Sequence, residues 1–119
     1  MTFNSFLYLV VGGAFGTLLR AASYFLIPST SFPWPTLVVN VVGCFLMGIG
    51  YSLIGDAPNN PLRWLILVGF LGAFTTFSTF GLDMMKLIQG KQYSQFVGYF
   101  FLNNSLGLAA IFTGLSITK

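Results

Sequence analysis

Four apolar segments, each of about 20 residues or more, divide this chain of 119 residues. They run from about 4 to 27, 35 to 54, 62 to 88 and 95 to 117, and turn sequences rich in Pro, Gly and polar residues separate them. A helix of about 20 residues crosses the hydrocarbon core of a bilayer, which is about 30 Å thick. Hydrophobic residues make up 55% of the chain and charged residues 6%, as in integral membrane proteins. We therefore predict an all-α integral membrane protein, with residues 1–119 forming a single membrane domain of four transmembrane helices.

The residue types that the chain lacks exclude several kinds of chemistry. It contains no His and a single cysteine, Cys44, which excludes thiolate and imidazole metal sites as well as Ser-His-Asp and Cys-His catalysis. Five Lys or Arg and two Asp or Glu give a formal net charge of +3, but these residues are scattered singly along the sequence. A nucleic-acid partner would need a clustered basic surface. We therefore predict neither an enzyme nor a nucleic-acid-binding protein.

The third apolar segment contains a polar run that lipid would not tolerate without partners. Residues 75–80 read Thr-Thr-Phe-Ser-Thr-Phe, which places four hydroxyls inside an otherwise apolar stretch. Irregular backbone and polar groups persist at this depth only where protein buries them or a cavity adjoins them. Gly69, Gly72 and Gly81 flank the run, and together with β-branched Thr they weaken helix continuity. We predict a break in the third helix near residues 72–80 and a pathway or binding site beside it.

Amide side chains occur at membrane depth in two other segments. Asn40 lies in the second segment, and Asn103, Asn104 and Ser105 lie in the fourth. A buried amide both donates and accepts hydrogen bonds and therefore seeks partners on neighbouring helices. For Asn40 alone, a purely structural role explains the residue at least as well as a functional one. The number of such groups favours a polar track through the bundle.

Phe77 and Phe80 are three residues apart, so they share one face of a helix. Packing is the ordinary role of such a pair. The edge of an aromatic ring is electropositive, however, so two rings turned edge-on to a narrow passage could stabilise a small anion without trapping it. The spacing is compatible with both interpretations.

Two charged side chains lie within or close to the spans. Arg20 precedes the expected end of the first span at Ile27 by almost two helical turns, and a charge is costly at the bilayer centre. Its side chain either extends to the interface or faces an aqueous vestibule, where it would attract anions. Asp83 lies three residues before Lys86, and a simple ion pair on one helix explains it. One acidic residue is a poor basis for a cation channel or a proton relay.

The basic residues give almost no bias in orientation. Four spans put both termini on one side of the membrane, which carries Arg63 and Lys119, while the other side carries Lys86, Lys91 and Arg20. The positive-inside rule needs an excess of basic residues on one side. Either the chain inserts in both orientations, which would allow an antiparallel two-fold dimer, or it simply has few charges. Four helices also leave little interior space, so a continuous pathway favours an oligomer.

Three segments carry a resemblance to a known family. Residues 12–20 (Gly-Gly-Ala-Phe-Gly-Thr-Leu-Leu-Arg), residues 36–45 (Thr-Leu-Val-Val-Asn-Val-Val-Gly-Cys-Phe) and residues 69–80 (Gly-Phe-Leu-Gly-Ala-Phe-Thr-Thr-Phe-Ser-Thr-Phe) occur in an order that resembles the Fluc (CrcB) family of fluoride channels. The resemblance implies an antiparallel, dual-topology homodimer with two fluoride pores, surrounded by lipid in the inner membrane of a prokaryote. Fluoride would leave the cytoplasm passively through these pores, which would relieve its toxicity.

The resemblance also implies roles for individual residues. Phe77 and Phe80 match the pore-lining phenylalanines whose ring edges face fluoride, Asn40 matches the pore asparagine, and Arg20 would lie near an aqueous vestibule. Further pore or fluoride-binding positions are Ser78, Thr79, Asp83, Tyr99 and Asn103. The family usually has Glu at the position of Asp83 and often Ser at that of Asn103, so this chain keeps the polarity there but changes the reach.

A structural sodium ion is the cofactor that the resemblance implies. The backbone carbonyls of Gly72 and Thr75, contributed by both subunits, would hold it at the centre of the dimer, where the third helix breaks. Half-helix ends expose carbonyl groups that can coordinate ions in this way.

Two other classes of protein also have to be weighed. A proton-coupled exporter resembling the small multidrug transporters would need an acidic residue in the first span, and none lies between Phe3 and Ile27. A non-transporting assembly subunit would explain the glycines but would leave the polar run without a role. Fluoride is small and strongly hydrated, so weak amide and hydroxyl donors suit its passage better than a strongly positive site, which would trap it.

Overall fold

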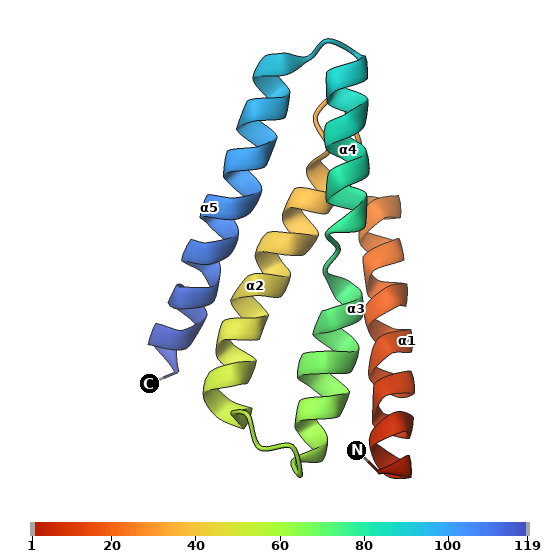
Figure 1. Ribbon diagram of the computed structural model, residues 1–119, viewed down its shortest axis with the longest axis vertical. Coiled ribbons are helices and arrows are strands. Elements are labelled where there is room, and N and C mark those ends of the chain that lie inside the picture. The colour runs from red at the N-terminus through yellow and green to blue at the C-terminus, as the bar shows by residue number, and fades with distance from the viewer. Residues whose placement is uncertain (1, 119) are drawn as a thin grey trace.

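The computed structural model describes residues 2–118, and every regular element in this range is a helix (Figure 1). The elements are α1 (Phe3–Leu26), α2 (Trp34–Ile54), the π-helical segment η1 (Arg63–Leu71), α3 (Gly72–Phe74), α4 (Ser78–Gln89) and α5 (Tyr93–Ile117). Four helical stretches are long and apolar enough to cross a membrane, and the third of them, Arg63–Gln89, comprises η1, α3 and α4. The expectation of an all-α chain with four candidate membrane spans is confirmed for these residues.

Local sequence explains where several helices begin and end. Thr2 caps α1, because its hydroxyl accepts a hydrogen bond from the Ser5 amide at 3.3 Å. Pro35 lies in the first turn of α2, where its missing N–H costs no hydrogen bond. Gly55, with φ of 74°, ends α2 in a conformation that residues with a side chain rarely adopt. These signals place the connections between spans at the two ends of the molecule.

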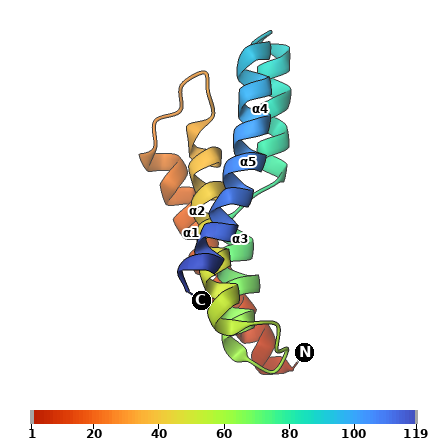
Figure 2. The ribbon, with the colours of Figure 1, turned by 90° about the vertical axis from the view of Figure 1, so that its left-hand side faces the viewer.

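The helices pack as two pairs. α1 lies along η1 and α3, whereas α2 lies along α5, as Figure 1 and the perpendicular view in Figure 2 show. Glycines form both contacts: a Cβ added at Gly12 would overlap the Leu65 carbonyl oxygen, and one at Gly48 would overlap that of Ile111. The Gly12-x-x-x-Gly16 spacing therefore serves close packing of α1 on η1 within one chain.

Most large apolar side chains lie on the outside of the protomer, as lipid contact requires. Phe15, Phe25 and Leu53 are all largely exposed. A small internal cluster lies toward the end of the molecule that carries the α4–α5 turn, and it consists of Leu37, Phe80, Leu87 and Tyr99. This cluster fixes α4 against α2 and α5.

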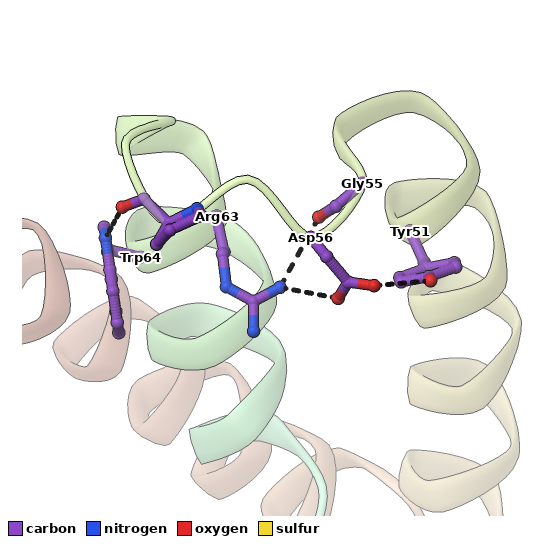
Figure 3. Close-up of polar contacts among 6 residues, drawn as sticks. Tyr51, Gly55, Asp56, Arg63 and Trp64 are labelled. Atoms are coloured by element: carbon purple, nitrogen blue, oxygen red, sulfur yellow. Dashed lines mark hydrogen bonds and ion pairs between the residues drawn. The ribbon is translucent and has the colours of Figure 1, made fainter.

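Polar contacts close the connection between α2 and η1 (Figure 3). Arg63 Nη1 pairs with Asp56 Oδ1 at 3.0 Å, and the Tyr51 hydroxyl donates to Asp56 Oδ2 at 2.7 Å. The hydrogen bond from Tyr51, followed by the Arg63 guanidinium, lowers the pKa of the Asp56 carboxyl. Trp64 Nε1 donates to the Pro58 carbonyl at 2.8 Å. The contact between Arg63 and Asp56 is the one ion pair among residues 2–118, and it partly neutralises the charge of Arg63.

Candidate functional site

Residues 75–77 separate α3 from α4 in the third span, and Asn40 of α2 supports the backbone there. α3 ends at Phe74, Thr75 is extended (φ −82°, ψ 161°), and α4 begins at Ser78. Asn40 Oδ1 accepts from the Thr76 amide at 2.9 Å, and Asn40 Nδ2 donates to the Thr76 carbonyl at 3.0 Å. One amide side chain therefore supplies both hydrogen bonds that this residue would make inside a continuous helix.

Two of the three amides expected on a polar track, Asn40 and Asn103, meet at this point. Asn40 Nδ2 also donates to Asn103 Oδ1 of α5 at 3.2 Å, and Asn103 Nδ2 donates to the Tyr99 carbonyl at 3.0 Å. Asn104 and Ser105 lie on exposed parts of α5, and Asn104 donates to its own helix at the Phe100 carbonyl. The structure thus joins Asn40 to Asn103 and leaves Ser105 outside the cluster.

A groove of about 280 Å³ runs along this cluster and is open at the surface of the protomer. Phe77 stands at its edge with 82% of its surface exposed, whereas Phe80 is 4% exposed. The two ring centroids are 5.8 Å apart, at 50° to one another. The groove is lined by Asn40, Gly43, Cys44, Met47, Thr75, Thr76, Phe77, Phe80, Asn103, Asn104 and Ile111. Aromatic rings, amides and a backbone turn therefore share one concave surface.

Asp83 belongs to a network of hydroxyls. Its Oδ2 accepts from the Tyr99 hydroxyl at 2.8 Å and from Thr36 Oγ1 at 2.7 Å, and the Tyr24 hydroxyl lies 2.5 Å from Thr36 Oγ1. Within residues 2–118 no ion pair joins Asp83 to Lys86, so the simple helix pair expected from their spacing is wrong. The hydroxyls of Thr36 on α2 and Tyr99 on α5 reach the carboxylate inside the bundle, and the Tyr24 hydroxyl on α1 connects to it through Thr36.

Thr36 and Tyr24 belong to this network but were not predicted from the sequence as site residues. Thr36 precedes Asn40 by four residues, so the two lie on one face of α2, and this spacing was the available signal. Tyr24 lies four residues after Arg20, on the face of α1 that turns toward the interior. Both extend the polar cluster from the groove toward the end of α4.

Two of the remaining predicted positions, Arg20 and Thr79, form hydrogen bonds beside the turn, whereas two others, Ser78 and Gly72, are exposed. Arg20 Nε donates to the Ala73 carbonyl at 2.9 Å, so its half-buried side chain supports the end of α3. Thr79 joins the turn, because Thr76 Oγ1 accepts from its amide at 3.3 Å and donates to its hydroxyl at 3.2 Å. Ser78 and Gly72 are exposed on the protomer surface and are not brought to the amide cluster.

The fold and the site together define a class: a multi-pass helical membrane protein that presents amides, hydroxyls and aromatic rings to a groove at mid-span. Comparison with known proteins then gives the family. The chain belongs to the family described as CrcB-like protein, Camphor Resistance (CrcB), whose profile matches residues 7–115. The family expected from the sequence motifs is thereby confirmed.

Curated relatives cover nearly the same length. The chain is 42% identical over 119 residues to the fluoride-specific ion channel FluC of Aeromonas salmonicida, a match that covers 96% of this chain and 95% of the relative. It is 40% identical over 121 residues to the protein of that name from Rhizobium etli, covering 95% and 94%, and 43% identical over 116 residues to one from Pseudomonas fluorescens, covering 91% of each. These names describe channels rather than enzymes.

Proposed function

We propose that this protein is a fluoride-selective channel that lets F⁻ cross the membrane passively. The observation that carries the proposal is the groove in which Phe77, Phe80 and the Asn40–Asn103 amide pair adjoin one another. Such a surface offers several weak donors and ring edges but no basic side chain, which suits an ion that must lose its water and still leave. The names of the relatives support fluoride as that ion.

The two amides have different tasks in this proposal. Both hydrogens of Asn40 Nδ2 are engaged, one with the Thr76 carbonyl and one with Asn103 Oδ1. Within the described residues, Asn103 Nδ2 donates one hydrogen bond, to the Tyr99 carbonyl, so it has a second hydrogen to offer. Asn40 therefore holds the turn, and Asn103 is the amide that donates to a passing anion.

Export follows from the chemistry of hydrogen fluoride. HF crosses membranes as a neutral acid and dissociates in a more alkaline cytoplasm, which traps F⁻ there. A passive pore then lets the anion leave down its own gradient, at no cost in metabolic energy. No proton-coupled step is needed, and α1 contains no acidic residue that would serve one.

The open groove also supports assembly as an antiparallel homodimer with two pores. Phe77 is largely exposed in the single protomer, and the groove has a wall on one side only. A second, inverted copy would bring its own groove to the same depth in the membrane, because the polar cluster lies near the middle of the span. The partner would thus supply the missing wall.

The third span has carbonyl groups that suit the proposed sodium ion. The Thr76 amide, which would bond the Gly72 carbonyl in a continuous helix, bonds Asn40 instead. Within residues 2–118, no hydrogen bond reaches the Gly72 or Thr75 carbonyl. Bare carbonyl oxygens fit a hard cation such as sodium, and Gly72 and Thr75 would hold it between two protomers. A crystal structure should show ion density against these oxygens, and density there for protein or lipid alone would contradict the assignment.

The decisive experiment is fluoride efflux from liposomes that contain the purified protein. Fluoride and chloride efflux are recorded with selective electrodes from the same preparation, with protein-free liposomes as the control. We expect rapid fluoride release and retained chloride. An absence of fluoride flux, or equal flux of both anions, would refute the channel.

A further inference from the structure

A second, smaller cavity of about 160 Å³ lies at the end of the molecule that carries the α4–α5 turn. Figure 2 shows that the connection between α1 and α2 reaches the same end as this turn. The cavity is lined by Ser29, Thr30, Ser31, Pro33, Asp83, Lys86, Leu87 and Gln92. We call this cavity the mouth. Three consecutive hydroxyl residues and a single basic residue, Lys86, distinguish it from the groove at mid-span.

Aromatic contacts fix the loop that carries these hydroxyls. The Phe32 ring lies 4.5 Å from the Trp34 ring and meets Tyr99 edge-on at 5.5 Å and 85°. Gln95 Nε2 of α5 donates to Ser31 Oγ at 3.1 Å. The Ser31 hydroxyl is therefore fixed in the wall of the cavity, and the Thr30 hydroxyl is fixed within the loop by its hydrogen bond to the Phe32 carbonyl.

Asp83 connects the mouth to the groove. Its side chain lines the mouth, and its Oδ2 accepts from the Tyr99 hydroxyl at 2.8 Å. The Tyr99 ring lies 5.1 Å from the Phe80 ring, which lines the groove. The mouth is thus one layer of side chains from the proposed fluoride site, on the side that faces the end of the bundle.

The negative charge of the Asp83 carboxylate would repel an approaching anion. Two hydroxyls bond its Oδ2, but they leave its formal negative charge at the mouth. Lys86 lines the same cavity, and among residues 2–118 it forms no ion pair, so its ammonium group is available to a third group. The positive charge of Lys86 offsets the negative charge of Asp83, so the electrostatic potential at the mouth no longer repels an anion.

We propose, building on the fluoride channel proposed above, that the mouth is a site where hydrated fluoride binds at one end of its pathway. Lys86 supplies the attracting charge, and the hydroxyls of Ser29 and Ser31 donate to the ion and its remaining water, whereas the Thr30 hydroxyl donates to the Phe32 carbonyl at 3.3 Å. Lys86 also stands in the last turn of α4, where a cation stabilises the helix end. The test must therefore separate attraction of the ion from support of the helix.

The test measures fluoride conductance of the full-length protein in planar bilayers at low and high ionic strength. At an ionic strength of about 0.01 M, we expect Lys86→Gln to lower conductance about threefold and Lys86→Glu about tenfold, because the change in charge doubles. Lys86→Arg keeps the charge and should conduct like the unaltered protein. At about 1 M of a bulky impermeant salt, the variants should converge, because the Debye length falls to about 3 Å.

Lys91→Gln is the matched control, since it removes the same charge at the same end of the molecule but outside the mouth. Gel filtration verifies that each variant is folded. Equal losses in Lys86→Gln and Lys91→Gln, or a loss that persists at high salt, would overturn the mouth site while leaving the channel intact. An unaltered protein without fluoride current would instead refute the channel, and the mouth with it.

Discussion

At the scale of single residues, Asn40 shows why a polar side chain belongs in an apolar helix. A break in a helix leaves an amide and a carbonyl without partners, and each costs about 1–3 kcal/mol when buried and unpaired. Only a side chain that both donates and accepts can satisfy the two groups of Thr76 together, and Asn40 does so. The structural role weighed for this residue and its position beside the groove are therefore parts of one arrangement.

Phe80→Ile tests whether fluoride conduction depends on the electropositive edge of the ring or only on the volume of the side chain. Isoleucine keeps an apolar side chain in the cluster around Tyr99 but removes the electropositive ring edge. We expect fluoride efflux to fall at least tenfold, while unfolding free energy falls by about 1–2 kcal/mol. Efflux from liposomes and gel filtration of the same sample provide the two measurements.

Phe15→Ile is the control for that substitution, because Phe15 lies on an exposed part of α1 and does not line the groove. It should leave efflux unchanged. If the Phe80→Ile variant also conducts fluoride normally while its assembly stays intact, Phe77 and Phe80 serve packing alone, which is the ordinary role of such a pair.

At the scale of elements, the sequence predicted the long helices but not the contacts between them. Length and apolar composition suffice for a membrane span, because the bilayer fixes both. The partners of Arg20 and Asp83 lie 53 and 16 residues away in sequence, at Ala73 and Tyr99. Such pairings depend on how helices cross, and local composition carries no information about that. The π-helical winding of η1 was likewise not predictable, since its residues are as apolar as those of α2.

Gly12→Ala tests the packing of α1 on η1. The added methyl group would overlap the Leu65 carbonyl oxygen, which belongs to backbone and cannot turn aside. We expect the unfolding free energy in detergent to fall by about 2 kcal/mol or more. Gly98→Ala on α5, where an added Cβ meets nothing within 4 Å, should be neutral or gain up to about 1 kcal/mol of helix propensity. Equal stability of the two variants would contradict the packing.

At the scale of the whole molecule, charge and shape favour the same assembly. By sequence, one end carries the basic residues Arg63 and Lys119, and the other carries Lys86, Lys91 and Arg20, so the two counts are nearly equal. Neither end therefore gives the insertion machinery a strong signal. The groove of one protomer is also incomplete on its open side. A chain that inserts both ways produces the inverted partner that could close that groove.

Added lysines at one end should separate orientation from folding. Ala57→Lys with Asn59→Lys places two charges on the exposed α2–η1 connection, and Gln89→Lys with Ser94→Lys does so at the opposite end. Each double variant should insert in a single orientation, which labelling of an engineered surface cysteine in intact cells would report. If the working unit is an antiparallel dimer, either variant alone loses fluoride efflux from cells, and expressing both together restores it. Full efflux from one variant alone would mean that a parallel assembly, or a single protomer, forms the pore.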